Sequence, residues 1–303
     1  MDIQNLLDDI VGSVQPLIGQ GAVADYIPSL GSVRRDQFGI SLATGTGDVY
    51  SSGDADVPFS IQSISKVFAL ALVLARDGDS IWKRVFREPS GNPFNSLVQL
   101  EQEDGIPRNP FINAGAIVVT DRLLSISANS PSAVRELLRK ESGNDSIDTD
   151  AEVAISEAQH GHRNASLAHF LASYGNLENP VDSVLDAYIN QCALAMSCTD
   201  LALASRFLAT NGLRSDGTPL LSPPQTKRIN AVMLTCGTYD AAGEFAYRVG
   251  LPGKSGVGGG IVAVVPNNCT ICVWSPGLGR SGNSLAGVAA LDEFTSRTGW
   301  SIF

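Results

Sequence analysis

The 303-residue sequence carries a formal net charge of -10 and is 44% hydrophobic, which is enough apolar content for a large core. The acidic balance argues against nucleic acid or an anionic membrane as a partner. No apolar run reaches the length of a membrane span, and the acidic N-terminus does not resemble a signal peptide, so we expect a cytoplasmic protein.

The hydrophobic pattern predicts helices near both ends, strands near both ends and a helical middle. A first helix over residues 2–18 precedes a β-hairpin of Phe38–Ala43 and Val49–Ser51, and a buried helix follows from about Gln62. Further helices are expected over residues 114–127, 131–141, 148–159, 164–174, 181–195, 199–210 and 223–235. Strands return at Gly260–Pro266 and Thr270–Ser275, before a last helix over Ser284–Arg297.

This order predicts an α+β fold in which an antiparallel sheet is built from both termini and an all-helical lobe is inserted between them. We expect one domain of residues 1–303, with a sheet lobe of about residues 1–60 and 250–303 and a helical lobe of about residues 61–249. A cleft between the two lobes is the expected place for a site.

Lys66 is the only charged side chain between Val57 and Ala75. A lysine inside such an apolar helix must be neutralised, paired or used in chemistry. Ser63 precedes it by three residues, so both side chains would share one face near a helix N-terminus, in a Ser-x-x-Lys arrangement. The structural alternative is that a serine, for example Ser60, only caps the helix.

Two further motifs follow in the chain. Tyr188-Ile189-Asn190 lies on a predicted helix, and Lys254-Ser255-Gly256 opens a glycine-rich run before a late strand. Alone, Tyr188 could be a core aromatic, and the glycines could form a flexible turn. A phosphate-binding loop is not indicated, because such a loop places its lysine after the glycines and before a helix. Together with Ser-x-x-Lys, the three motifs match the serine acyl-transferase fold of β-lactamases and penicillin-binding proteins.

Several segments resemble the glutaminase family more closely, from about Tyr26 to Trp300. They are Gln62–Lys66, Glu88–Gly91, Pro107–Ile117, Ser156-Glu157, Arg163-Asn164, Tyr188 with Gln191-Cys192, Cys236–Tyr239 and Lys254–Ile261. This resemblance implies a β-lactamase/transpeptidase-like fold and the hydrolysis of L-glutamine to L-glutamate and ammonia. It also implies that no metal or organic cofactor is needed, and that the protein forms a homodimer or homotetramer.

The resemblance assigns the chemistry to three residues. Ser63 would be the nucleophile that forms a γ-glutamyl ester, Lys66 would accept its proton, and Tyr188 would relay a proton to the departing ammonia. The N–H groups of Ser63 and Val257 would stabilise the oxyanion. Whether Lys66 or Tyr188 is the primary base stays open. Ser63, Tyr188 and Val257 would also contact the substrate.

Substrate binding is assigned to other positions of the same resemblance. Glu157 suits the α-ammonium group, and Asn113, Asn164 and Tyr239 suit the carboxylate or the amide. Tyr26 resembles a position near the mouth of the pocket. From the residues alone, Glu157 would be part of a solvated helix face, and Asn113 would be a helix cap.

Two rival functions follow from the same motifs. A penicillin-recognising hydrolase or carboxypeptidase would use Glu157 in deacylation, but the sequence lacks an export signal. A non-catalytic glutamine-binding protein would be expected to lose Ser63, Lys66 or Tyr188, and all three are present.

The cysteines and histidines suggest no metal or redox site. Five cysteines without a framework spacing predict free thiols, and Cys269-x-x-Cys272 lies in a β-like run. His160, His162 and His169 are expected at the surface, because no further ligands complete a metal site.

Overall fold

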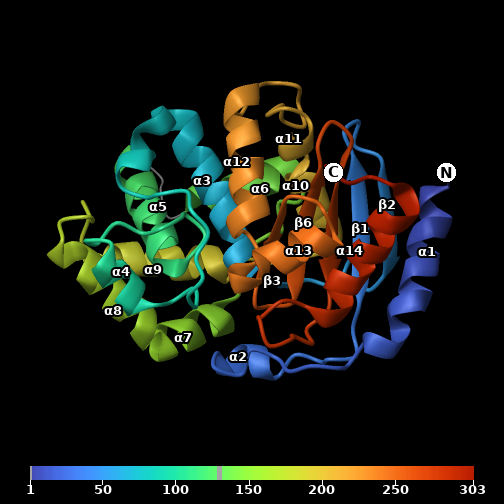
Figure 1. Ribbon diagram of the computed structural model, residues 1–303, viewed down its shortest axis with the longest axis horizontal. Helices are drawn as coiled ribbons and strands as arrows, with labels where there is room; N and C mark the ends of the chain where they lie inside the picture. The colour runs from blue at the N-terminus through green and yellow to red at the C-terminus, as the bar shows by residue number, and fades with distance from the viewer. Residues whose placement is uncertain (1, 128–131) are drawn as a thin grey trace.

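The computed structural model describes residues 2–127 and 132–303 (Figure 1). Within these residues, the main sheet has five antiparallel strands in the order β2-β1-β7-β6-β5. Their bounds are β1 Gly39–Thr44, β2 Val49–Gly53, β5 Gly253–Ser255, β6 Gly260–Val265 and β7 Cys269–Trp274. Because β1 pairs with β7, the sheet joins the two ends of the chain. The predicted α+β class is confirmed.

The sheet separates two hydrophobic cores, and successive side chains on a strand enter different cores. On β1, Ile40 and Leu42 enter the core under α1 (Ile3–Val14) and α14 (Leu285–Thr298), whereas Ala43 enters the core on the helical side. Figure 1 shows α1 and α14 beside the sheet and most other helices away from it. Both β6 and β7 are buried along their whole length, which explains their nearly continuous apolar sequence.

The helix that follows Ser63 is buried on all sides, as predicted. This helix, α3 (Ser65–Asp77), has buried side chains from Ser65 to Leu74. It packs against four other helices: α5 (Asn113–Ile126), α6 (Ala133–Ser142), α9 (Val181–Cys192) and α12 (Pro223–Cys236). An ionisable group at the start of α3 is therefore held in a dry and rigid environment.

Shorter elements complete the frame around the start of α3. A two-stranded sheet pairs β3 (Phe59–Ser60) with β4 (Ala195–Met196), and the 3-10 turn η2 (Gln62–Ile64) links β3 to α3. The other α-helices are α2 Pro28–Gly31, α4 Leu97–Gln102, α7 Ala151–His160, α8 His162–Ser173, α10 Cys198–Ala204, α11 Arg206–Ala209 and α13 Ala242–Arg248. The remaining 3-10 turns are η1 Gln15–Leu17, η3 Gly78–Lys83 and η5 Tyr239–Ala241.

Several predicted helix bounds were wrong for local reasons. The helix predicted over 181–195 ends at Cys192, because the following residues pair with β3. The one predicted over 199–210 is divided into α10 and α11 at Ser205, and the first helix gives way to η1 after Val14. The helix predicted from 148 begins at Ala151, because the Asp150 carboxylate caps it. For the helix predicted over 131–141, residue 131 lies outside the described residues.

The cysteines and histidines lie where the sequence predicted. All five cysteines are free and buried. Cys269 and Cys272 belong to β7 and enter different cores, which confirms that they are strand residues. The three histidines are exposed on α7 and α8.

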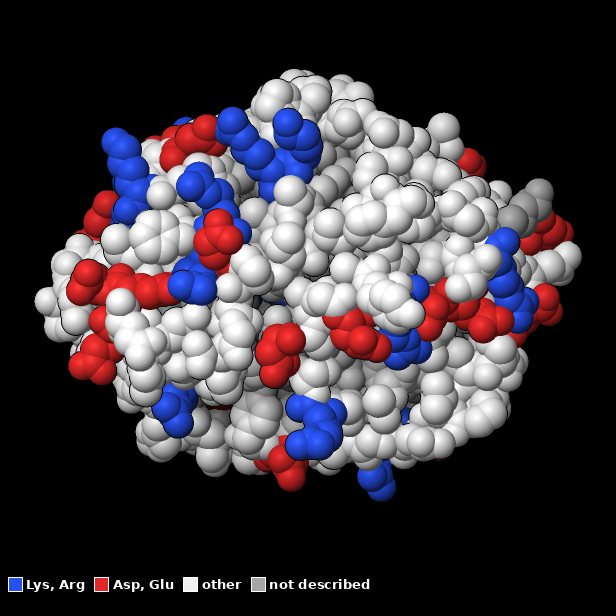
Figure 2. Space-filling view, in the orientation of Figure 1, with Lys and Arg blue, Asp and Glu red and all other residues white. Residues whose placement is uncertain are grey.

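The surface on the side of Figure 2 carries both signs of charge. Lys and Arg side chains are interspersed with Asp and Glu, and wide uncharged areas separate them (Figure 2). In the described part of the chain, we find no helix that is long and apolar enough to cross a membrane.

Candidate active site

Ser63 lies in η2, in the short connection between β3 and α3. The sequence predicted an α-helix from about Gln62, but α3 begins only at Ser65. Gln62 has a φ of 48°, a left-handed conformation that is uncommon for a residue with a side chain and that occurs often at functional sites. Because Ser63 stands near the start of a helical run, its N–H has no partner within that run. Ser60 does not cap α3, because the N-cap residue of α3 is Ile64 and no side chain caps this helix. The Ser60 hydroxyl instead donates to Cys192 O at 3.1 Å.

Lys66 stands on the first turn of α3 and is 3% exposed. Its Nζ donates to Phe111 O at 3.1 Å and to Asn113 Oδ1 at 2.7 Å. Among the described residues, no carboxylate forms a salt bridge with it. Burial lowers the pKa of Lys66 to about 8, although Cys192 and Glu157 favour the charged form. A neutral, proton-accepting lysine is therefore accessible near neutral pH.

Tyr188 is buried on α9 beside Lys66. It is 3% exposed, and Lys66 Nζ lies 5.8 Å from the centre of its ring. Burial raises the pKa of Tyr188 well above its usual value, so the phenol keeps its proton. The third residue of its motif is not part of this arrangement, because Asn190 donates to Asp186 O and Oδ1, one turn earlier on α9.

Tyr239 contacts the candidate nucleophile itself. It begins η5 with a left-handed φ of 59° and is 8% exposed. Its hydroxyl donates to Ser255 O at 3.4 Å, and Ser63 lies beside it. Burial raises the pKa of Tyr239, and the interactions with Ser63 and Ser255 only partly oppose that effect. Tyr239 therefore lies next to Ser63 on the side of β5.

A small cavity of about 90 Å³ opens above Ser63. Of the predicted site residues, the following line it: Ser63, Asn113, Glu157, Asn164, Tyr188 and Val257. Tyr26 lines it too, and is 56% exposed. Lys66 and Tyr239 do not line it but touch residues that do. The structure therefore brings all the predicted site residues together.

Glu157 is a buried carboxylate in this cavity. It lies on α7, is 6% exposed and accepts one long hydrogen bond, from Gln62 Nε2 at 3.5 Å. The alternative of a solvated helix face is therefore wrong. Burial raises the pKa of Glu157 to about 7, and the hydrogen bond from Gln62 and the charge of Lys66 counteract this only in part. A carboxylate held in this way would be stabilised by a cationic ligand.

Asn113 and Asn164 connect Lys66 to the cavity. Asn113 receives the lysine hydrogen bond at Oδ1, and its Nδ2 donates to Asn164 Oδ1 at 2.8 Å. The side chain of Asn113 makes no capping bond to α5, so the capping alternative is wrong. Among the residues that the structure describes, one N–H of Asn113 and both of Asn164 have no acceptor and are left for a ligand.

The comparisons with known proteins decide the family. The model of the glutaminase family matches residues 21–303. The chain belongs to the glutaminase family. Glutaminase from Streptomyces coelicolor is 62% identical over 298 residues, which cover 98% of this chain and 97% of the relative. Glutaminase from Paraburkholderia phytofirmans is 55% identical over 304 residues and covers 100% of both chains.

Solved structures agree with this assignment. The probable glutaminase from Bacillus subtilis, complexed with 6-diazo-5-oxo-L-norleucine, superposes with a TM-score of 0.90 at 33% identity. The match covers 100% of this chain and 98% of that chain. The resemblance and the fold inferred from the sequence are confirmed.

Lys254, Gln62 and Arg163 of this glutaminase-family site had no role in the sequence interpretation, although all three belong to quoted motifs. Lys254 on β5 is fully buried, and its Nζ lies 4.9 Å from the centre of the Tyr239 ring. Burial, and then the charge of Lys66, lower its pKa well below the usual value. Gln62 donates to both Ser60 Oγ and Glu157 Oε2. The signal for Lys254 was its motif, but sequence alone did not show that it lies behind Tyr239.

Proposed function

We propose that this protein hydrolyses L-glutamine to L-glutamate and ammonia, with Ser63 as the nucleophile. The observation that carries the proposal is that Ser63 and the buried carboxylate of Glu157 line one small cavity, with buried Lys66 behind it. The relatives named glutaminase support this activity. The Bacillus subtilis structure supports the substrate, because 6-diazo-5-oxo-L-norleucine is a glutamine analogue.

In the first step, Ser63 Oγ attacks the side-chain amide carbon and its proton passes to Lys66. The pKa values favour Lys66 over Tyr188 as the base, because burial brings the lysine to about 8 but keeps the phenol protonated. The N–H groups of Ser63 and Val257 are proposed to bind the oxyanion. Their positions support this role, at the start of η2 and in the turn after β5.

In the second step, the tetrahedral intermediate expels ammonia and leaves a γ-glutamyl ester on Ser63. Tyr188 gives its proton to the leaving nitrogen and recovers a proton from Lys66, so the proton lost by Ser63 leaves with ammonia. A water molecule then attacks the ester carbon, releases L-glutamate and restores the serine hydroxyl.

The other cavity residues suit a free α-amino acid. Glu157 is proposed to pair with the α-ammonium group, while the remaining N–H groups of Asn113 and Asn164 bind the carboxylate. Tyr239 is proposed to bind the substrate amide beside Ser63. Arg163 also lines the cavity and adds a positive charge near the carboxylate. The size of the cavity also suits a small ligand, because its volume of about 90 Å³ is far smaller than the roughly 300–1,000 Å³ of sites for drug-sized ligands.

The test is the release of ammonia and glutamate from L-glutamine by the purified protein, with Ser63→Ala and L-asparagine as controls. Release that requires Ser63 and favours glutamine supports the proposal. No release, combined with penicillin acylation of Ser63, would favour a penicillin-recognising hydrolase. Glutamine binding without turnover would favour a non-catalytic binding protein.

Four features stay predictions. They are the cytoplasmic location, the assembly into a homodimer or homotetramer, and the independence from metal and organic cofactors. The fourth is the division of one domain into a sheet lobe and a helical lobe at about residues 60 and 250.

A further inference from the structure

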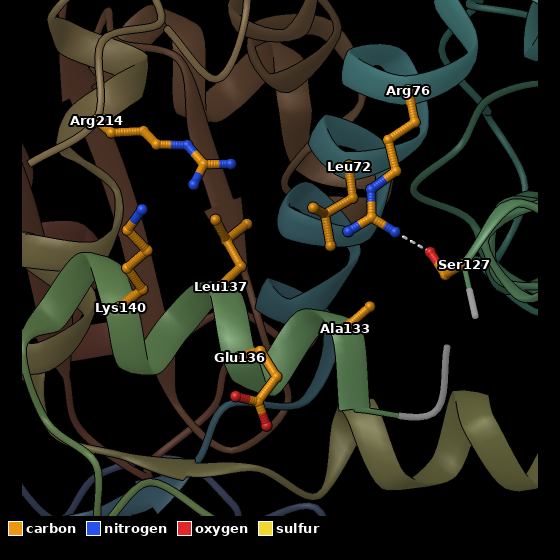
Figure 3. A pocket seen from close by; sticks show the side chains of 8 residues that line it. All are labelled: Leu72, Arg76, Ser127, Ala133, Glu136, Leu137, Lys140 and Arg214. Atoms are coloured by element: carbon orange, nitrogen blue, oxygen red, sulfur yellow. Dashed lines mark hydrogen bonds between the residues drawn. The ribbon is translucent and has the colours of Figure 1, made fainter. Parts of the chain in front are cut away.

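A second, larger cavity lies at the other end of α3. Its free volume is about 370 Å³, and it opens between α3, α6 and the turn after α11 (Figure 3). None of its lining residues lines the cavity above Ser63. Arg76, which borders it, stands ten residues after Lys66 on α3. At 1.5 Å per residue, this places it about 15 Å along the helix from Lys66. The two cavities are therefore separate.

The floor of this cavity is apolar. Leu72 from α3 and Leu137 from α6 point into it, with Ala133 beside them (Figure 3). These side chains belong to the large core and are only 3%, 5% and 8% exposed. Because these side chains are already almost completely buried, a ligand that touches the floor gains mainly by burying its own apolar surface.

Two guanidinium groups stand over this floor from opposite sides. Figure 3 shows Arg214 and Arg76 reaching toward the space above Leu137 and Leu72. The partner of Arg76 is the neutral hydroxyl of Ser127. Arg214 Nε is buried without a hydrogen-bond acceptor among the described residues, since Glu141 Oε1 lies 4.0 Å away. Counting only residues 2–127 and 132–303, neither guanidinium group has its donors fully used.

The other charged groups around the cavity are engaged elsewhere. Lys140 Nζ pairs with Asp216 Oδ2 at 2.9 Å. The Glu136 carboxylate points away from the cavity in Figure 3 and lies 3.8 Å from Arg135 and 3.9 Å from Arg139. The positive charge that faces the apolar floor therefore comes from Arg76 and from Arg214, whose charge is partly balanced by the buried Glu141 carboxylate at 4.0 Å.

We propose that this cavity binds a small organic anion, in which a carboxylate or phosphate group is carried on an apolar body. The anionic group would lie between Arg76 and Arg214, because guanidinium groups match the geometry of both oxyanions. The apolar body would cover Leu72, Ala133 and Leu137. Inorganic phosphate has no apolar body to cover the floor, and an uncharged apolar molecule has no anionic group to pair with the two arginines.

The test is isothermal titration with hexanoate, hexyl phosphate, inorganic phosphate and hexanol. We expect at least one of the two hexyl anions to bind about tenfold more tightly than both hexanol and inorganic phosphate, because it makes both kinds of contact. Comparison of hexanoate with hexyl phosphate shows which anionic group the cavity prefers.

Variants locate the binding. Arg76→Gln and Arg214→Gln should each weaken the favoured anion about tenfold and leave the weak binding of hexanol unchanged. Arg34→Gln is the matched control. Arg34 is exposed, pairs with Asp36 at 2.8 Å and does not line this cavity. Thermal melts verify that each variant is folded.

Three results would overturn the proposal. The first is no saturable binding of either hexyl anion up to about 10 mM, an affinity too weak for a formed site. The second is equal binding of hexanol or inorganic phosphate. The third is binding that is unaffected by Arg76→Gln and Arg214→Gln. None of these results depends on the hydrolysis of glutamine.

Discussion

Replacing Glu157 by Gln should weaken substrate binding far more than it slows the chemical step. The carboxylate is 6% exposed and, within the described part of the chain, its one side-chain hydrogen bond is the 3.5 Å contact with Gln62, so it can bind the α-ammonium group. A hydrogen bond to a charged group contributes about 1.5–3 kcal/mol, and 1.4 kcal/mol is a tenfold change, so KM should rise about 10- to 150-fold. The ammonium group is remote from the reacting amide, so kcat should change little.

The same residue should give the wild-type enzyme a distinctive pH dependence. The pKa of Glu157 is raised to about 7, and only the ionised form pairs with the ammonium group. Binding should therefore improve as the pH rises through about 7. The pKa of Lys66 is about 8, so kcat/KM should increase further until the lysine is neutral. In the Glu157→Gln variant, the improvement of binding near pH 7 should be lost, and the increase of kcat/KM near pH 8 should remain.

Steady-state kinetics between pH 6 and 9 would measure both effects, with Glu152→Gln as a matched control. Glu152 is exposed on the same helix, so its variant should behave as the wild type. A fall in kcat with KM unchanged would refute the binding role and place Glu157 in the chemistry. An unchanged pH profile would refute the link to its ionisation.

The remaining predictions concern the nucleophile, the base and the backbone that holds them. Ser63→Ala should abolish turnover and keep glutamine binding by calorimetry, whereas lost binding would mean that the cavity is disturbed. Lys66→Met should lower kcat/KM by about 10²–10⁴-fold and remove the rise near pH 8; a variant that keeps that rise would exclude Lys66 as its source. At Gly256, an added Cβ would lie 2.5 Å from Ile61 O, so Gly256→Ala should lower Tm by roughly 2–10 °C. At Gly243 in α13, an added Cβ meets nothing within 4 Å, so Gly243→Ala should not lower Tm and should raise it slightly, because Ala favours a helix more than Gly does; equal melting of both variants would contradict the packing argument.

The parts of the fold that the sequence predicted are those with a strong local signal. The strands β6 and β7 are long apolar runs, and a lone lysine in an apolar helix marked Lys66. The short strand β4 has no such signal, because it exists only through its pairing with β3. For the same reason the helix before it was extended too far, to residue 195.

The site was predictable as a set of residues but not as a geometry. The motifs named Ser63, Tyr188 and Val257, and the structure brings them to one cavity. The left-handed backbone of Gln62 and the position of Lys254 behind Tyr239 follow from tertiary contacts, which a single sequence does not display. Burial likewise turned Glu157 from an ordinary acidic side chain into a carboxylate with a raised pKa.

Attack by Ser63 on the substrate is the step on which the other proposed roles depend. The most direct test is peptide mass spectrometry after reaction with 6-diazo-5-oxo-L-norleucine, whose diazoketone group alkylates an active-site nucleophile. We expect modification of Ser63, protection by L-glutamate and no modification of the Ser63→Ala variant. Modification of Cys192 or Tyr239 with Ser63 unmodified, together with turnover of L-glutamine by Ser63→Ala, would show that Ser63 is not the nucleophile.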